Sequence, residues 1–292
     1  MEPLRVTTRP TLRKPVLVAA FRGWNDGAQA ATLAAGYLAK TWAAERFAEV
    51  DPESFFDFQA TRPHVSLEEG LTRRIDWPET GFYHARPNGL DRDVVLLLGI
   101  EPNLRWRTFT DLVVGLARDL GIELVITLGA LLADVPHTRS APVTGSATDS
   151  ELVERLGLSA SRYEGPTGIV GVLQNACATA GLTSVSLWAS VPHYVAASPN
   201  PKVALALVRG FEGVAGLAVD AGELESAADD YERQVSAAVA SDPEVKAFVE
   251  RLENAMDEVT AENPPDEESL PSADTIARDF QRFLRQRGPE DS

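Results

Sequence analysis

Four short apolar runs, separated by stretches long enough for a helix, constrain the fold of this 292-residue chain more than any other feature. The runs are rich in Val, Leu, Ile and Ala, a composition typical of strands buried on both faces of a sheet. They span residues 16–21, 94–100, 122–130 and 184–191. Strands that alternate with helices predict an α/β fold, in this case a three-layer α/β/α arrangement around a mainly parallel sheet.

The segments between and after these runs have the composition of helices. The expected helices span residues 27–42, 106–120, 168–180 and 201–217, with a shorter one near 149–156. Two less apolar stretches, 46–58 and 71–86, have the alternation of half-exposed strands. We expect these two stretches to form an antiparallel extension of the sheet.

Charge divides the chain into two unequal parts. Residues 223–292 hold 19 acidic and 7 basic side chains, whereas residues 1–222 hold 24 and 20. We therefore predict an α/β body at 1–222 and an acidic helical extension at 223–292. Within the extension the pattern predicts a helical hairpin at 223–262, a linker at 263–271 and a final helix at 272–287. Asp242 is the expected cap of the second hairpin helix, which begins at Pro243.

Composition excludes several classes of function. The net charge of −16 argues against nucleic acid as a partner, because nucleic-acid binding needs a basic face. No apolar run approaches the ~20 residues of a membrane helix, so no membrane association is expected. Cys177 is the single cysteine, which rules out an intrachain disulfide and fits a reducing cytoplasm. Its apolar, small-residue helix indicates a buried structural thiol.

Polar side chains follow the apolar runs at the points where the predicted strands end. In parallel strands these ends meet at one edge of the sheet, where α/β proteins bind their ligands. We therefore expect the following residues to converge in one crevice: Trp24, Asn25, Asp26, Glu101, Asp134, His137, Arg139, Thr167 and His193. An anionic ligand would suit such a crevice, because a guanidinium and the free N–H groups of helix N-termini all favour negative charge.

Each cluster in this crevice also has a structural interpretation. Asn25 and Asp26 are good helix caps, with Trp24 packing beside them. Asp134 and His137 have the chemistry of an acid–base pair, with Arg139 as an anion-binding group, but they also suit an ordinary loop. Thr167 precedes the helix at 168–180 and is either part of an anion site or a cap.

The sequence lacks the motifs of common enzyme classes. The triplet Val-Pro-His occurs twice, ending at His137 and at His193, yet two histidines without Cys/His spacing do not predict a metal site. Neither a phosphate-binding fingerprint nor a serine-hydrolase elbow is present. We predict neither a metal nor a cofactor, and no residue is assigned a catalytic role.

Taken in order, these clusters resemble the proteasome assembly chaperone 2 family, in particular its longer bacterial members with a C-terminal helical extension. The matching segments cover about residues 15–215 and are 20–27, 57–63, 99–102, 129–139, 166–169 and 188–194. The resemblance implies an α/β/α fold like that of nucleoside phosphorylases and related hydrolases. It also implies self-association, as a homotrimer or another small homo-oligomer.

The resemblance also implies a function. Eukaryotic relatives assemble proteasome rings without catalysis and dock partly through a C-terminal hydrophobic–Tyr–any tail. Residues 288–292 of this sequence, Gly-Pro-Glu-Asp-Ser, do not match that tail. The leading hypothesis is a non-enzymatic, assembly-chaperone-like interaction protein with proteasome subunits as partners. The alternative is a small-molecule enzyme or binder, with hydrolase- or phosphorylase-like chemistry in the crevice.

Overall fold

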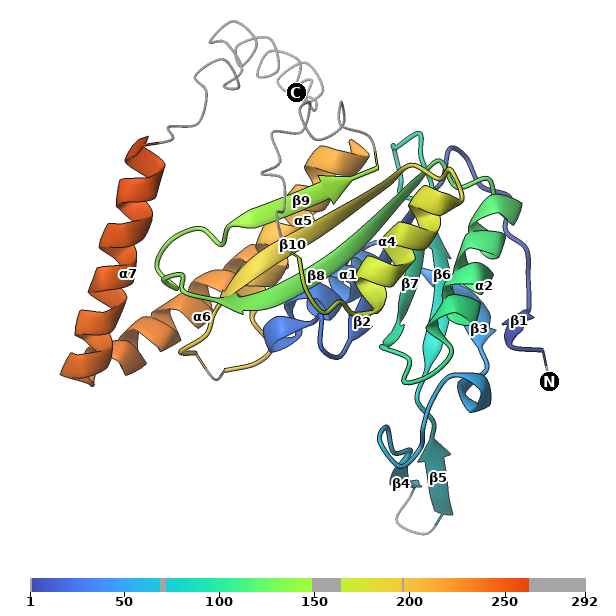
Figure 1. Cartoon of the computed structure of the whole chain (residues 1–292), viewed down its shortest axis with the longest axis horizontal. Helices are drawn as coiled ribbons and strands as arrows, with labels where there is room; N and C mark the ends of the chain where they lie inside the picture. The colour runs from blue at the N-terminus through green and yellow to red at the C-terminus, as the bar shows by residue number, and fades with distance from the viewer. Residues whose placement is uncertain (1, 69–71, 149–163, 196, 263–292) are drawn as a thin grey trace, which may run out of the picture.

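A computed structural model describes residues 2–68, 72–148, 164–195 and 197–262 (Figure 1). Its centre is an eight-stranded sheet flanked by helices. In spatial order the strands are β1 (Leu4–Val6), β3 (Glu45–Val50), β6 (Thr80–Ala85), β7 (Val94–Ile100), β2 (Val16–Arg22), β8 (Leu124–Ala133), β10 (Ser184–Pro192) and β9 (Val143–Ala147).

The four apolar runs form the middle of this sheet, as predicted. β2 pairs in parallel with β7 on one side and β8 on the other, and β8 pairs in parallel with β10. Six consecutive residues of β2 are buried, because helices cover both faces of these strands. Antiparallel strands complete the sheet at both sides, β6, β3 and β1 beyond β7 and β9 beyond β10.

The predicted antiparallel extension is correct for part of its length. β3 and β6 occupy the expected positions in the sheet. Residues 51–58 are not a strand, because a 3-10 turn at Pro52–Ser54 folds Phe55 and Phe56 into the core. Residues 72–76 form β5 (Thr72–Asp76), which leaves the sheet and pairs with β4 (His64–Glu68) in a separate hairpin.

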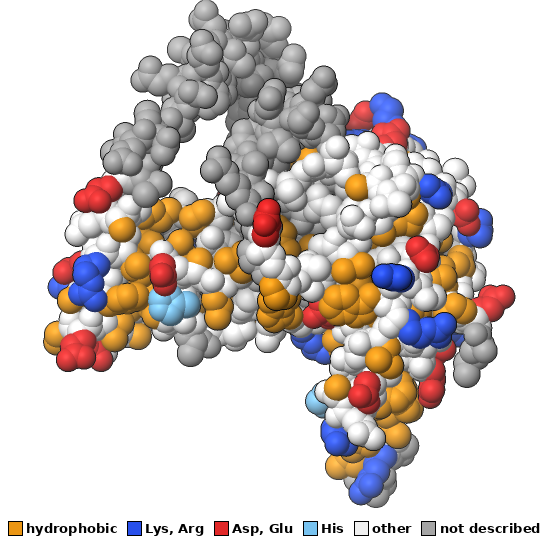
Figure 2. All heavy atoms as spheres, in the orientation of Figure 1, with side chains coloured by type: hydrophobic (Ala, Val, Ile, Leu, Met, Phe, Trp, Pro, Cys, Tyr) orange, Lys and Arg blue, Asp and Glu red, His pale blue; other side chains and the backbone are white. Residues whose placement is uncertain are grey.

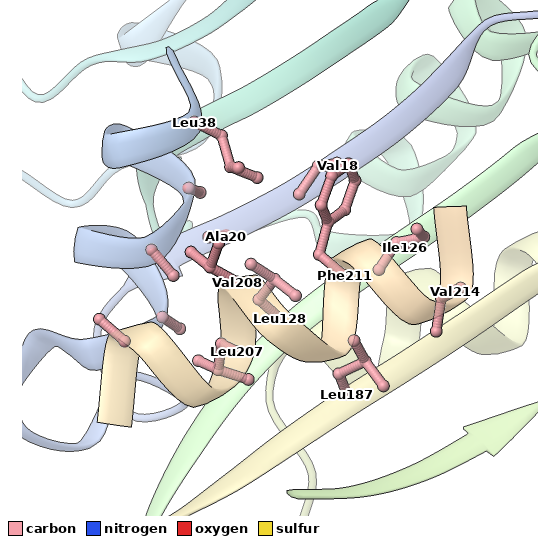
Figure 3. Close-up of a cluster of buried hydrophobic side chains, with 14 of the residues drawn as sticks. Val18, Ala20, Leu38, Ile126, Leu128, Leu187, Leu207, Val208, Phe211 and Val214 are labelled. Carbon is pink, nitrogen blue, oxygen red and sulfur yellow. The ribbon is translucent and has the colours of Figure 1, made fainter. Parts of the chain in front are cut away.

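Helices cover the two faces of the sheet and complete the three layers. α1 (Ala30–Thr41) and α5 (Pro201–Ala215) pack on one face, and α2 (Trp106–Asp119) and α4 (Ile169–Thr179) pack on the other. Figure 3 shows the first of these cores, where the ring of Phe211 lies among side chains of β2 and β8. The three-layer α/β/α prediction is therefore confirmed.

The C-terminal part is a helical hairpin made of α6 (Gly222–Ala240) and α7 (Pro243–Glu262). The Asp242 carboxylate accepts hydrogen bonds from the N–H groups of Glu244 and Val245, at 2.9 and 3.3 Å, which confirms the predicted cap. α6 packs along α5 and buries Leu224 and Ala228. The expected helices at 149–156 and 272–287 and the linker at 263–271 lie outside the described residues. The division of the chain at residue 222 stays a prediction.

None of the helices in the described ranges is long and apolar enough to cross a membrane.

Two leucines of β8 provide a test of this layering. Leu128 is fully buried between the sheet and α5, whereas Leu132, on the same face of the strand, is 59% exposed. We expect Leu128→Ala to lower the free energy of unfolding by about 2–5 kcal/mol, because it removes buried methyl groups and leaves a cavity. Leu132→Ala should change it by less than about 1 kcal/mol. Urea denaturation measures both values, and equal losses would contradict this assignment of the layers.

Candidate functional site

The nine candidate residues follow the carboxyl ends of β2, β7, β8 and β10 or precede α4. They form two groups at one edge of the sheet. The first group lies where β2 and β7 end beside α4, and the second lies where β8 and β10 end beside α6 and α7. The two groups are neighbours along β8. The Ala130 N–H of β8 donates to the Asn25 carbonyl at 2.8 Å, and the backbone N–H of His193 donates to the Ala133 carbonyl of β8 at 3.2 Å.

The carboxylate of Glu101 is the centre of the first group. One oxygen accepts hydrogen bonds from the Asn25 side-chain amide and from the Ile169 N–H, both at 2.8 Å. The other oxygen accepts from the Trp24 N–H at 3.2 Å. Ile169 is the first residue of α4, so the negative charge lies where the helix dipole favours it. Three separate segments of the chain are thus joined through one side chain.

Two glycines allow this close approach. A Cβ atom on Gly168 would lie 2.2 Å from the Asn25 amide nitrogen and 2.6 Å from the Glu101 carboxylate. Gly23 has a φ of +151°, and a Cβ atom there would lie 2.9 Å from the Cβ of Glu101. Neither position accepts a larger residue without moving the carboxylate. Gly23 and Gly168, which lie near the candidates Asn25 and Thr167 in the sequence, were therefore a signal that the backbone packs closely here.

Asp26, and not Asn25, holds the start of α1. Its carboxylate accepts hydrogen bonds from the N–H groups of Ala31 and Thr32, at 2.9 and 3.1 Å, and from the Thr32 hydroxyl. Burial raises the pKa of Asp26, and these hydrogen bonds act in the opposite direction. The predicted capping by Asn25 is wrong, since its amide is directed to Glu101. The predicted packing of Trp24 is also wrong, because its side chain is 64% exposed.

His137 is the most enclosed member of the second group, at 3% exposure. Its Nδ1 lies 2.7 Å from the Tyr194 hydroxyl, and its Nε2 lies 3.1 Å from the Ser236 hydroxyl of α6. The His137 carbonyl accepts a hydrogen bond from the Lys202 ammonium. Burial lowers the pKa of His137, and the nearby Lys202 charge lowers it further.

The predicted pairing of Asp134 with His137 does not form. Asp134 instead lies against His193, with 3.0 Å between its carboxylate and the His193 Nδ1. Arg139 donates two hydrogen bonds to Asp257 of α7, at 3.0 and 2.8 Å, and lies 3.6 Å from Glu253. Asp134 therefore pairs with the second of the two candidate histidines, and Arg139 has carboxylate partners on α7.

Aromatic side chains complete the contact between this second group and α7. The Phe248 ring lies 5.7 Å from the His193 ring and 5.8 Å from the Tyr194 ring, both nearly perpendicular. The loops after β8 and β10 thus form the contact surface on which the α6–α7 hairpin packs. Ser236 and Asp257 are parts of this contact surface that sequence reasoning missed as site residues, because nothing local in the sequence marks a partner about 100 residues away. Tyr194 directly follows the candidate His193 but was not itself among the nine candidates.

The groups proposed to bind an anion already have carboxylate partners from the chain itself. Glu101 occupies the N-terminus of α4, Asp26 occupies that of α1, and Asp257 takes Arg139. Thr167 is exposed, and among the described residues its hydroxyl makes only a 3.5 Å contact with the Gly168 carbonyl. No three His, Cys, Asp or Glu side chains in the described ranges are grouped so that they could hold a metal ion.

Two cavities in the described part of the chain lie near this edge, and neither is lined by the whole set of candidates. The cavity lined by His137 and Arg139 has a volume of about 10 Å³, which is room for about one water molecule. A larger cavity of about 730 Å³ lies beside the ends of β2 and β7, and none of the nine candidates lines it. The contacts of Glu101, His137 and Arg139 at this edge therefore join distant segments of the chain.

Comparisons with known proteins give the chain a family context. The model of the PAC2 family matches residues 20–239. A PAC2 family protein from Streptomyces avermitilis is 47% identical, with a TM-score of 0.75, over 80% of this chain and 99% of that chain. A proteasome-assembly chaperone homologue from Mycobacterium tuberculosis is 46% identical, with the same TM-score and coverage. A Mycobacterium tuberculosis protein of unknown function is 28% identical, with a TM-score of 0.81, over 88% of this chain and 92% of that chain. No curated protein matches the sequence.

The Glu101 contacts predict a measurable contribution to stability. Glu101→Gln replaces one accepting oxygen by an amide that cannot accept, so one of the bonded N–H groups loses its partner. We expect this change to lower the free energy of unfolding by about 1–3 kcal/mol. Glu123→Gln is the matched control. Within the part of the chain that the structure describes, the half-exposed Glu123 carboxylate pairs only with Arg92, so this change should cost less than about 1 kcal/mol. Thermal or urea unfolding measures both, and a neutral Glu101→Gln would refute the structural role.

His137 predicts a pH dependence of stability. Its pKa in the folded state lies below the ordinary value of 6.5, so the unfolded chain binds the proton more readily. The contribution of His137 is fully present above pH ~6.5 and is lost as the pH falls through the folded-state pKa. We expect His137→Gln to flatten this part of the stability profile, measured by urea denaturation between pH 7.5 and 5. Parallel profiles for the two proteins would contradict the prediction.

Proposed function

The chain belongs to the PAC2 family, and from this membership we propose that it is a non-enzymatic, assembly-chaperone-like protein that acts on proteasome subunits. The observation that carries the proposal is its similarity to the mycobacterial proteasome-assembly chaperone homologue, which extends along nearly the whole of that chain. The family match includes the β8 and β10 loops and most of α6. The proposal therefore concerns the body together with the start of its helical extension.

The arrangement of the candidate site supports an interaction protein. An enzyme of this fold would present unpaired acid–base or anion-binding groups in an accessible crevice. Here Glu101, Asp26 and Arg139 are engaged with other parts of the chain. These contacts hold loops and helices in place, which is what a rigid binding surface needs.

We also propose that the protein self-associates as a homotrimer or another small homo-oligomer and that it works in the cytoplasm. Family resemblance supports the first of these proposals. The second rests on cysteine usage, because the single thiol, Cys177, is buried. Burial raises the pKa of this thiol to about 11, so it is a poor partner for disulfide exchange.

Reconstitution with purified proteasome subunits from the same organism tests this function. We expect the protein to bind free or half-assembled rings and to raise the rate at which complete, peptide-hydrolysing particles form. Native gels and peptidase assays measure this directly. An unrelated acidic protein of similar size controls for the effect of a net charge of −16. Unchanged assembly together with no binding to any proteasome subunit would refute the proposal.

A further inference from the structure

The cavity of about 730 Å³ beside the ends of β2 and β7 has the features of a ligand site. Its walls come from the ends of these two strands, the start of α1, β6, and the segments 60–64 and 76–79. The volume is within the range of pockets that bind small molecules in proteins. Because none of the nine candidate residues lines it, this cavity is separate from the junction around Glu101 and His137.

Hydrogen-bond donors without partners line this cavity. The exposed guanidinium groups of Arg22 and Arg62 make no hydrogen bond or ion pair among the described residues. Within the same part of the chain, the Gln29 side-chain amide and the Tyr83 hydroxyl also have no hydrogen-bond partner. The charge of Arg22 acts on Asp26, but that carboxylate is bonded to the start of α1. Figure 2 shows Lys and Arg side chains near the point where the β4–β5 hairpin leaves the body.

The carboxylates on the wall of the cavity already have cationic partners. Asp76 accepts a hydrogen bond from the Arg74 guanidinium at 2.7 Å, and Glu79 lies 3.8 Å from the Arg46 guanidinium. Neither Arg74 nor Arg46 lines the cavity. The two guanidinium groups that do line it therefore have no acceptor among the described residues, and an anion would supply one.

The backbone beside Gln29 has a conformation that residues other than glycine rarely adopt. Ala28 and Gln29 have φ angles of +47° and +54°, both in the left-handed region. The Ala28 carbonyl accepts a hydrogen bond from the Asn200 N–H at 3.0 Å, which holds this turn against the body. Unfavourable backbone conformations of this kind gather at sites that position a side chain for binding. Here the turn places Gln29 on the wall of the cavity.

Aromatic side chains form another part of the wall. Trp77 is 46% exposed, and its ring packs edge-on against that of Phe58, with 4.8 Å between the centroids. The half-buried ring of Tyr83 also lines the cavity. An aromatic ring of a ligand would find stacking partners in these two side chains. The wall thus combines positive charge with aromatic surface.

We propose that this cavity binds a small aromatic anion, whose charged group is a phosphate or a carboxylate. Arg22 and Arg62 bind the charged group, because a guanidinium matches the geometry of both anions. Gln29 and Tyr83 donate further hydrogen bonds, and Trp77 contacts the ring. The proposal concerns binding and assigns no reaction. It goes beyond the assembly role, since binding at this site requires no proteasome subunit.

Calorimetric titration of the full chain with four probes tests the site. The probes are naphthyl phosphate, naphthoate, naphthol and inorganic phosphate. We expect saturable binding of at least one of the two aromatic anions, with one molecule bound per chain. Naphthol and inorganic phosphate should bind more weakly, because each lacks one of the two groups that the cavity recognises. The tighter of the two aromatic anions identifies the charged group.

Arginine variants locate the bound anion. Arg22→Gln and Arg62→Gln should each raise the Kd by about tenfold or more, because each removes a charge-assisted hydrogen bond. Arg107→Gln is the matched control. Arg107 is exposed and lines a different cavity, of about 530 Å³, between α2 and α4. This variant loses the same charge and should keep the Kd within about twofold, because salt screens a distant charge. Circular dichroism checks the fold of each variant.

Four outcomes would overturn the proposal. The first is the absence of saturable binding by either aromatic anion at millimolar concentration. The second is equal affinity for naphthol, which would show that the guanidinium groups take no part. An unchanged Kd in both Arg22→Gln and Arg62→Gln would place the ligand elsewhere. An equal loss of affinity in Arg107→Gln would show that net charge, and not this cavity, attracts the anion.

Discussion

Burial of β7, β2, β8 and β10 on both faces is the constraint on which the rest of this structure depends. Because helices cover each face, the strands must be largely apolar. Thr127 of β8 and Ser186 of β10 are buried and hydrogen-bond to each other at 2.8 Å, and the charged side chains lie at the strand ends and in the loops that follow. Parallel pairing then brings four of these loops to one edge. The position of Glu101 beside α4 and that of His137 beside α6 both follow from this arrangement.

At that edge, charged side chains are paired with other groups of the same chain. A buried or helix-terminal charge without a partner is costly, and here each has one: Glu101 and Asp26 accept N–H groups of α4 and α1, and Arg139 meets Asp257. The result is a rigid junction between segments. The junction holds in place the loops and helices whose surfaces the proposed interaction role would use.

The exposed surfaces are unevenly distributed over the molecule. The exposed apolar side chains of Val65, Leu67 and Ile75 lie together on the β4–β5 hairpin, while negative charge gathers on α6 and α7. The α6–α7 hairpin is held to the body by Phe248, His137 and Arg139. The junction at the edge of the sheet therefore also determines where the acidic surface lies.

The sequence by itself determined the features that depend on neighbouring residues. The four buried strands and the helices that alternate with them follow from local apolar periodicity, and the start of α7 at Pro243 follows from the Asp242 cap. The position of the candidate residues at one edge of the sheet could likewise be predicted, because it needs only the rule that the carboxyl ends of parallel strands lie at the same edge.

Tertiary structure alone decided which partner each polar group takes. Asn25 binds Glu101, 76 residues away, and His137 binds Ser236, 99 residues away. Asp134 pairs with His193 although His137 is nearer in the sequence, and β5 pairs with β4 outside the main sheet. Such choices depend on the distances between folded segments and on competition among several suitable partners. Periodicity and capping rules describe neither, because they extend over only a few residues along the chain.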